Sequence, residues 1–322
     1  MTAIMESTKQ YKPNQDIELA VVIPFYKISY FDRLLSALSR QTNKNFTVYI
    51  GDDCSPSDPS SINRQYRKKL AITYHRFKDR LGHKHLTQQW ERCLQLTKEE
   101  KWVWILPDDD LPAINVVEEF YSALDEINAN NIDVARMPLQ IIDSQDNIID
   151  PHSEEPLIES NYDFYSRIVR GKTASSLGDN IFRKSKLESL GGFVEFPNAW
   201  GSDHATLLNV SSGSNIYCLK NTLLGFRMSG ENISSNREDG DIKMSARVAF
   251  AHWLKSNERI FPKPPDDEFY RLFYLKGEYF AFYEFSFSFR LWKELYRLRK
   301  ICAPSLSLLP FIKILIIRLC NK

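Results

Sequence analysis

Apolar runs and helical periodicity alternate along the first 140 residues of this 322-residue chain. Short runs rich in apolar and β-branched residues predict strands at 18–26, 46–50 and 71–77, then from Trp102 onward and at 134–142. Between them, apolar side chains recur at helical spacing and predict helices at 30–40, 62–70, 86–96 and 116–128. Strands that alternate with helices in this way favour an α/β fold, a mostly parallel, Rossmann-like sheet with helices on both faces.

The rest of the chain changes character twice. A polar segment with two prolines at 143–162 predicts a loop, and short strands and turns are expected at 173–234. From about residue 245 the pattern is helical and rich in aromatic residues. We therefore expect an N-terminal tail, an α/β domain made of two halves, and a helical C-terminal extension, at 1–16, 17–245 (halves 17–140 and 141–245) and 246–322.

Three adjacent carboxylates, Asp108, Asp109 and Asp110, follow the predicted strand that begins at Trp102. Carboxylates this close repel one another unless a cation or hydrogen-bond donors offset their charge. Oxygen ligands at the carboxyl end of a strand suit Mg²⁺ or Mn²⁺ that also holds a phosphate. A solvated acidic loop that caps the next helix is the alternative interpretation, and the cluster on its own does not choose between the two.

Two further clusters follow predicted strands. Residues 24–26, Pro-Phe-Tyr, come after the first strand, and Asp52 and Asp53 come after the second. Ligands of open α/β sheets bind beyond the carboxyl ends of the strands, so these clusters and the triple aspartate together predict one site. Taken singly, Tyr26 is also compatible with a core aromatic residue, and Asp53 with an ordinary turn.

Composition limits the classes of partner that we expect and indicates the cellular compartment. The net charge of only +1 gives no argument for a nucleic-acid partner. Five scattered cysteines without a CxxC pair are typical of reduced thiols in a cytosolic protein. The first 16 residues lack the apolar core of a signal peptide, so we expect the protein to act in the cytoplasm.

The C-terminal segment 290–322 is basic. Eight Lys and Arg residues against one Glu give it a charge of +7, which leaves −6 on the first 289 residues. Pro310 and Lys313 interrupt its apolar run and argue against a membrane-spanning helix. A basic, aromatic-rich tail fits peripheral binding to the anionic inner face of the plasma membrane. Packing on the α/β domain or on a partner in a homodimer is the alternative.

The order of these clusters resembles that of the inverting family 2 glycosyltransferases, which have the GT-A nucleotide-diphospho-sugar transferase fold. The resemblance covers roughly 17–235 and rests on short segments at 21–26, 50–55, 104–110, 191–193, 200–203 and 227–234. Each segment is weakly specific, and their shared order carries the resemblance. It implies that the half at 17–140 binds the nucleotide sugar and that the half at 141–245 receives the acceptor.

The resemblance also implies roles for single residues. It places the catalytic base at Asp203 and a Mn²⁺ or Mg²⁺ ion at Asp109 and Asp110. It places donor binding at Pro24, Phe25, Tyr26, Asp52, Asp53, Gly82, Lys84, Asp108 and Arg227. From spacing alone, the N-cap of the helix that follows is the favoured interpretation of Asp203, and only the resemblance favours the catalytic role. Arg227 equally fits a surface ion pair with an acid such as Glu231.

Two departures from the family pattern matter. Pro107 stands where many relatives have the first acid, so Asp109 is the favoured direct metal ligand, with Asp108 facing the ribose or nearby amides. Residues 82–84, Gly-His-Lys, stand where relatives often have a glycine followed by Arg-Asn. This second departure leaves the contacts to the base, and with them the choice of uridine, open.

The function that the resemblance implies is metal-dependent transfer of a sugar, with inversion. The donor would be a nucleotide-diphosphate sugar, with a UDP-sugar favoured, and the acceptor a hydroxyl of a glycan or lipid-linked molecule. Capsule, O-antigen or exopolysaccharide assembly is the expected setting. The alternative is a non-catalytic protein that binds nucleotide sugars or glycans on the same fold.

Overall fold

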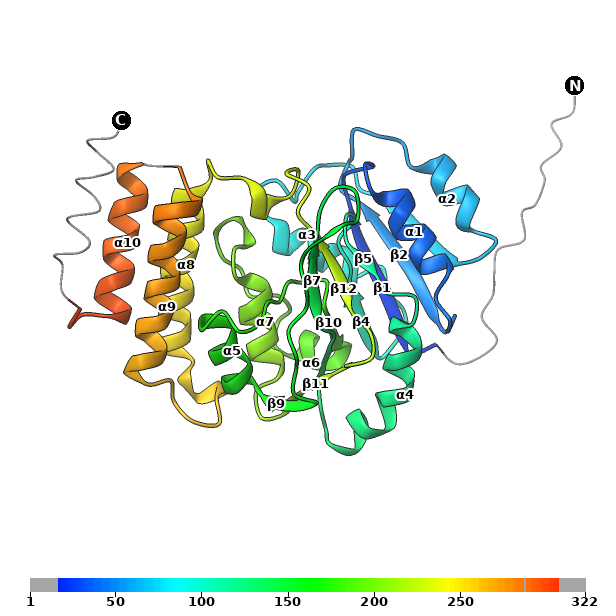
Figure 1. Ribbon diagram of the computed structural model, residues 1–322. Helices are drawn as coiled ribbons and strands as arrows, with labels where there is room; N and C mark the ends of the chain where they lie inside the picture. Colours follow the sequence, from blue (N-terminus) through cyan, green and yellow to red (C-terminus); the bar gives the residue numbers. More distant parts are fainter. Residues whose placement is uncertain (1–16, 287, 307–322) are drawn as a thin grey trace, which may run out of the picture.

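The computed structural model describes residues 17–286 and 288–306, with the main sheet toward one end and three long helices at the other (Figure 1). The main sheet has the strand order β3-β2-β1-β4-β10-β6-β11-β9. Its strands are β1 Leu19–Phe25, β2 Phe46–Asp52, β3 Ala71–Arg76, β4 Trp102–Ile105, β6 Val134–Arg136, β9 Ile158–Ser160, β10 Asn180–Arg183 and β11 Asn215–Cys218. The first four in chain order are all parallel, as are β6 and β11, whereas β9 and β10 run antiparallel to their neighbours. The predicted α/β sheet is confirmed.

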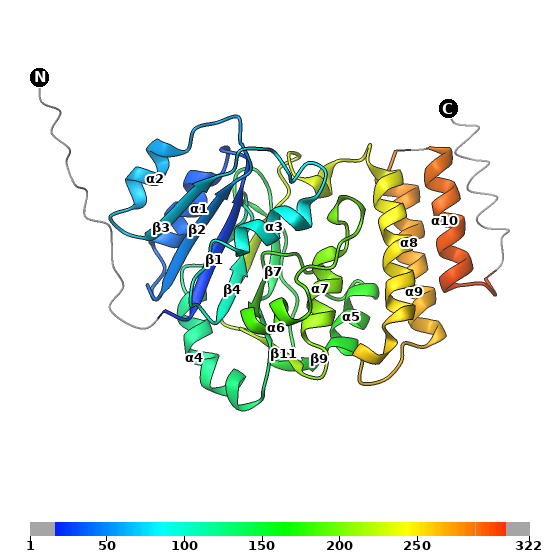
Figure 2. The same ribbon diagram turned by 180° about the vertical axis from the view of Figure 1, so that it is seen from behind.

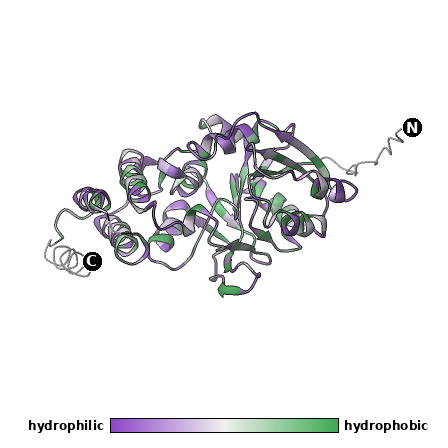
Figure 3. Ribbon diagram, turned by 90° about the horizontal axis from the view of Figure 1, so that it is seen from above, coloured by the Kyte–Doolittle hydropathy of each residue, from purple (hydrophilic) through white to green (hydrophobic). Residues whose placement is uncertain are grey.

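Alternate residues of β1 enter two separate hydrophobic cores, because successive side chains of a strand point to opposite faces. Leu19, Val21 and Ile23 face one core, and Ala20 and Val22 face the other. Figure 3 shows hydrophobic colouring along the strands of the central sheet. The first core is covered by α1 Phe31–Ser39, α2 Ser60–Tyr66 and α4 Val116–Ala129. The second is covered by α3 Leu86–Leu94, α5 Asn161–Val169, α6 Lys184–Ser189 and α7 Ser202–Val210.

The C-terminal helices extend the second core. They are α8 Gly240–Ser256, α9 Asp267–Tyr279, a π-helical turn at Phe280–Glu284 and α10 Phe289–Cys302. One continuous apolar cluster runs from Val22 in the sheet to Leu298 in α10, and Figures 1 and 2 show the three helices side by side. Helix α8 also crosses residue 245, where the sequence pattern places a domain boundary. Within the described part of the chain, no helix combines the length and apolar character needed to cross a bilayer.

Two segments differ from the sequence prediction. The single strand expected at 134–142 is two strands, β6 in the main sheet and β7 Leu139–Ile142 in a second sheet. Pro138 separates them, because proline cannot donate a hydrogen bond to a strand ladder. The predicted loop at 143–162 contains two short strands, β8 and β9.

The second sheet has the order β5-β12-β7-β8, and its other strands are β5 Leu111–Pro112, β12 Leu224–Arg227 and β8 Ile148–Asp150. Strand β5 begins directly after Asp110 and pairs with β12, which ends at Arg227. The pairing therefore brings Arg227 beside the triple aspartate. The remaining helical turns are 3₁₀, at Pro197–Ala199, Ile233–Ser235 and Glu258–Ile260.

Candidate active site

A cavity of about 650 Å³ lies at the carboxyl ends of β1, β2 and β4 and reaches the C-terminal helices. Eight of the predicted site residues line it: Pro24, Phe25, Tyr26, Asp53, Gly82, Asp108, Asp109 and Asp203. Four others do not line it: Asp52, Lys84, Asp110 and Arg227. Strand ends that are distant in sequence thus meet at one cavity, as expected for a parallel sheet.

The three adjacent aspartates point in three directions. One carboxylate oxygen of Asp108 accepts hydrogen bonds from the N–H groups of Tyr26 and Lys27, each at 2.7 Å, and so joins the ends of β4 and β1. Asp109 lines the cavity. Asp110 turns back into the protein, where its Oδ1 accepts from the N–H of Arg227 at 3.1 Å and its Oδ2 has no partner among the described residues.

Burial makes this cluster electrostatically unfavourable. It raises the pKa of Asp108 to about 7, with the charge of Asp109 as the second cause. Burial also raises the pKa of Asp109, and it raises that of Asp110 well above its ordinary value. A bound divalent cation reverses this effect because it stabilises the ionised carboxylates. The cluster therefore has the electrostatics of a site completed by a cation.

A Mn²⁺ or Mg²⁺ ion at this cavity would take only part of its ligands from the protein. Within the described residues, no group of three or more His, Cys, Asp or Glu side chains forms a complete metal cage. Ions of this type commonly take one or two protein carboxylates, with substrate phosphates and water completing the shell. Asp109 fits that arrangement because it lines the cavity and forms no ion pair with a described residue. Asp110 does not fit as predicted, because its side chain is 1% exposed and lies away from the cavity.

Arg227 does not line the cavity, but it does form an ion pair with an exposed acid, as in the second of its two predicted roles, although that acid is Asp146 and not Glu231. Its side chain is fully buried, so its predicted role in donor binding is not supported. Its Nε donates to the backbone oxygen of Asp109 at 2.7 Å, and its guanidinium pairs with Asp146 at 2.6 Å and packs on the ring of Tyr30. Arg227 therefore holds the backbone of Asp109 in place from the buried side of the loop, away from the cavity.

The neighbouring acids Asp52 and Asp53 have different surroundings. Asp52 is fully buried, and its Oδ2 accepts from the hydroxyl of Tyr74 and pairs with Arg76 at 2.8 Å, so its predicted role in donor binding is not supported. Asp53 lines the cavity, accepts from the N–H groups of residues 81 and 82, and pairs with Arg92 at 2.5 Å. Asp53 therefore holds the backbone of the 81–82 loop against the cavity.

Beside that loop, the predicted contribution of Lys84 is not supported. Lys84 is exposed and outside the cavity lining. Near the strand ends, sequence reasoning missed Lys27 and Arg80, which are among the cations that line the cavity. The guanidinium of Arg80 packs 4.1 Å from the centre of the Tyr26 ring, which also lines the cavity. The signal was present, since Lys27 directly follows the Pro-Phe-Tyr cluster.

Asp203 lies in the first turn of α7 and lines the cavity. The N-cap residue of α7 is Gly201, so the interpretation of Asp203 as the N-cap is wrong. Gly201 has a left-handed φ of 84°, and a Cβ there would lie 2.8 Å from Phe250, so glycine is required twice over. Oδ1 of Asp203 accepts from the N–H of His204 at 2.8 Å, which fixes the carboxylate.

A loop at 175–178 completes the cavity wall near Asp203, and sequence reasoning did not anticipate it. Asp179 holds this loop: it is fully buried, accepts from the N–H of Ser176 at 2.6 Å and pairs with Arg136. The loop in turn contacts the acid-bearing helix, because the backbone oxygen of Ser175 lies 3.2 Å from Nε2 of His204. The position of Asp203 therefore depends on a buried ion pair behind the cavity.

A mostly parallel α/β sheet whose strand ends deliver carboxylates into one cavity defines a Rossmann-like, GT-A type of enzyme fold. The family described as glycosyl transferase family 2 matches residues 20–185, more than half of the chain, and the chain belongs to this family. It is a glycosyltransferase, so the predicted enzyme is confirmed and the alternative of a non-catalytic binding protein is not supported.

Solved structures share the fold at low sequence identity. The structure of S. aureus TarS 1–349 in complex with UDP-GlcNAc is similar with a TM-score of 0.66 and 17% identity, covering 89% of this chain and 82% of that one. The mannosyltransferase PcManGT from Pyrobaculum calidifontis, in complex with GDP-Man and Mn²⁺, has a TM-score of 0.50 and 16% identity, covering 95% of this chain and 81% of that one. A comparison with curated proteins gave no significant match.

Proposed function

We propose that the protein transfers a sugar, with inversion, from a nucleotide-diphosphate sugar to an acceptor hydroxyl in this cavity. The observation that carries the proposal is that Asp109 and Asp203, from distant parts of the chain, line one cavity together with residues 24–26. The similar folds that hold UDP-GlcNAc and GDP-Man support a nucleotide-sugar donor. A glycan or lipid-linked acceptor, and capsule, O-antigen or exopolysaccharide assembly, stay predictions.

Each group has a role in this proposal. Tyr26, Arg80 and Asp53 form the wall for the nucleotide, and Lys27 lies beside the aspartates to receive the diphosphate. A divalent cation held by Asp109 would offset the charge of the leaving diphosphate. Asp203 accepts the proton of the attacking hydroxyl. A base on the face opposite the leaving group leads to inversion, and the cavity wall holds both reactants in line.

Donor binding tests the proposal directly. We expect a nucleotide sugar, with a UDP-sugar favoured, to raise the melting temperature in the presence of Mn²⁺ and to lose most of this effect in EDTA. A ligand at 100 times its Kd stabilises a protein by about 2.7 kcal/mol, which a thermal melt detects readily. GDP-sugars and free sugars are the matched controls. If no nucleotide sugar stabilises the protein, the proposed activity is wrong. Equal stabilisation in EDTA would exclude a role for the metal in donor binding.

The basic C-terminal segment supports peripheral attachment to an anionic membrane face. In its described part, α10 packs inward with Leu291, Leu295 and Leu298. Residues 307–322 of the predicted tail lie outside the described residues. The outward face of α10 combines aromatic and basic side chains: Phe289, Arg290, Lys293, Tyr296, Arg297 and Lys300. Such a face suits the interface of an anionic bilayer.

Replacing Lys293, Arg297 and Lys300 together with glutamine should weaken binding to vesicles that contain phosphatidylglycerol. Each basic residue near an anionic surface contributes about 1 kcal/mol, so three predict a loss of more than about 100-fold. Co-sedimentation measures this. Glutamine at 67–69, three exposed basic residues beyond α2 at the other end of the molecule, is the control. Unchanged pelleting would remove the membrane proposal, and loss of a dimer in the variant would point to a homodimer face.

A further inference from the structure

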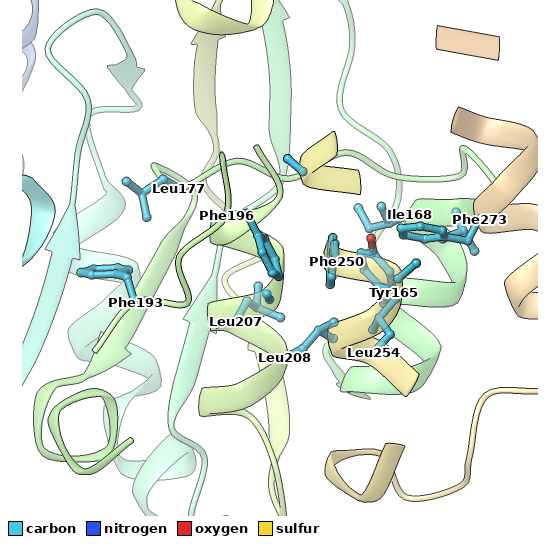
Figure 4. Close-up of a cluster of buried hydrophobic side chains, with 14 of the residues drawn as sticks. Tyr165, Ile168, Leu177, Phe193, Phe196, Leu207, Leu208, Phe250, Leu254 and Phe273 are labelled. Carbon is cyan, nitrogen blue, oxygen red and sulfur yellow. The ribbon is translucent and has the colours of Figure 1, made fainter. Parts of the chain in front are cut away.

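The cavity extends past Asp203 to a second end formed by the helices α5, α8 and α9. Aromatic and aliphatic side chains from these helices line it, among them Tyr165, Ile168 and Phe250. Figure 4 shows these three side chains grouped together with Phe273. Two cations, Arg247 of α8 and Lys276 of α9, line the same end. This region, called the basic end below, is separate from the donor residues at the strand ends.

Neither cation has an acidic partner within the described residues. Arg247 is 8% exposed, packs 4.0 Å from the centre of the Phe273 ring, and donates through one terminal nitrogen to the backbone oxygen of Phe273. Its buried Nε has no hydrogen-bond partner. The ammonium of Lys276 donates to the backbone oxygen of Ile168 at 2.6 Å. Two positive charges are therefore held in a largely apolar wall with only backbone oxygens to offset them.

This arrangement is electrostatically unfavourable without an anion. Burial, followed by the charge of Arg247, lowers the pKa of Lys276 to about 8. Burial also lowers the pKa of Arg247, and the groups that oppose this shift are Tyr165 and Cys302, not a carboxylate. Two other buried arginines are neutralised by carboxylates, since Arg136 pairs with Asp179 and Glu155, and Arg227 pairs with Asp146. Two further buried cations, Arg299 and Lys243, also form no ion pair with a described residue, but neither of them lines the cavity.

The packing of α9 against α8 leaves just enough room for the side chain of Arg247. A Cβ at position 277 would lie 2.7 Å from the Nε of Arg247, so the glycine there leaves room for the guanidinium to cross α9. Tyr165 lies between the basic end and the proposed base. Its ring packs against that of His204, the neighbour of Asp203. Its pKa is raised mainly by burial, and the charges of Arg247 and Asp203 both act on it. Asp203, Arg247 and Lys276 line the same cavity, so a molecule that presents a hydroxyl to Asp203 can extend toward the two cations.

We infer that the basic end binds a phosphate group on the acceptor, held by Arg247 and Lys276 while the acceptor hydroxyl faces Asp203. An arginine fork and a lysine point charge are the donors that recognise phosphate oxygens. The aromatic wall packs against the apolar faces of the same molecule. This inference rests on the proposed function, which it deepens by giving the acceptor a chemical class, a phosphorylated alcohol or phosphodiester. The phosphate can belong to a lipid carrier or to a soluble polymer.

Binding of sn-glycerol 3-phosphate, with glycerol as the neutral match, tests the inference on the full-length protein. With UDP and Mn²⁺ present to fill the donor half, we expect glycerol 3-phosphate to bind and glycerol not to bind, by calorimetry. Arg247→Met and Lys276→Met should each weaken binding at least about fivefold. Arg271→Met, an exposed arginine on the same helix as Lys276, should have no effect. If Arg247→Met fails to fold, the half-buried Lys276 variant carries the test.

The outcomes separate this inference from the proposed function. UDP binding is measured on every variant, and it should stay unchanged because neither cation lies among the donor residues. Absent or variant-independent binding of glycerol 3-phosphate would overturn the inference while leaving donor binding intact. Competition between glycerol 3-phosphate and UDP would also overturn it, since the phosphate would then occupy the donor half. Dodecyl phosphate identifies the source: tighter binding than glycerol 3-phosphate indicates a lipid-linked acceptor, and weaker binding a soluble one.

Discussion

Asp203→Asn should abolish sugar transfer while leaving donor binding intact. Asparagine keeps the size of the side chain and can still accept the hydrogen bond from the His204 N–H, but it cannot take up the proton of an attacking hydroxyl. General-base catalysis contributes about 10²–10⁴-fold to rate, so kcat should fall by that factor. Acceptor-dependent release of the nucleotide measures it, and the donor Kd should be unchanged.

Asp163→Asn is the matched control for this experiment. Asp163 is also a carboxylate in the first turn of a helix, α5, but it is exposed and outside the cavity. Its replacement should leave kcat unaltered, with at most a small loss of stability from the weaker helix start. Full transfer activity in the Asp203 variant would exclude it as the base. Loss of both donor binding and melting temperature would indicate a structural role instead.

Asp109→Asn should remove the dependence of donor binding on Mn²⁺ and lower kcat/KM by about 10³-fold. A metal that stabilises the leaving diphosphate contributes several kcal/mol, and about 4 kcal/mol corresponds to this factor. The reason is geometric: Asp109 is the member of the aspartate cluster that lines the cavity without supporting neighbouring backbone amides. Titration of Mn²⁺ in the presence of UDP, followed by calorimetry, measures the loss.

Asp110→Asn tests whether Asp110 coordinates the metal ion or only lies beside the residue that does. Asp110 lies next to Asp109 in the chain but accepts from the N–H of Arg227 and is shielded from the cavity. We expect this variant to lower the melting temperature and to leave the Mn²⁺ affinity within about twofold, since the buried side chain of Asp110 does not reach the cavity where the ion would bind. Equal loss of Mn²⁺ binding in the two variants would restore Asp110 as a ligand.

Much of the fold follows from local patterns that sequence reasoning can use. The strands β1, β2 and β4 are short apolar runs buried on both faces, and α1, α3 and α4 place apolar residues at helical spacing. The approximate site also follows, because the carboxyl ends of parallel strands meet at one edge. The break at Pro138 was readable in principle, since proline is poorly tolerated inside a strand.

The orientation of individual side chains does not follow from the sequence. Asp52 and Asp53 are adjacent, yet one pairs with Arg76 of the neighbouring strand β3 and the other faces the cavity, because neighbouring side chains in an extended chain point to opposite sides. Arg227 becomes a buried support only through the pairing of β12 with β5, a contact between segments more than 100 residues apart. No local pattern encodes such long-range partners.

The two walls of the cavity come from different stretches of chain, and this has a consequence for how specificity can change. Residues before 110 supply the donor wall, whereas helices after 160 supply the opposite wall, including α8 and α9 beyond the family match that ends at 185. If the opposite wall holds the acceptor, as proposed, substitutions in those helices should change the choice of acceptor without disturbing the donor wall. Chimeras that exchange the C-terminal helices must, however, carry their part of the shared core with them, because α8 to α10 do not form a detachable module.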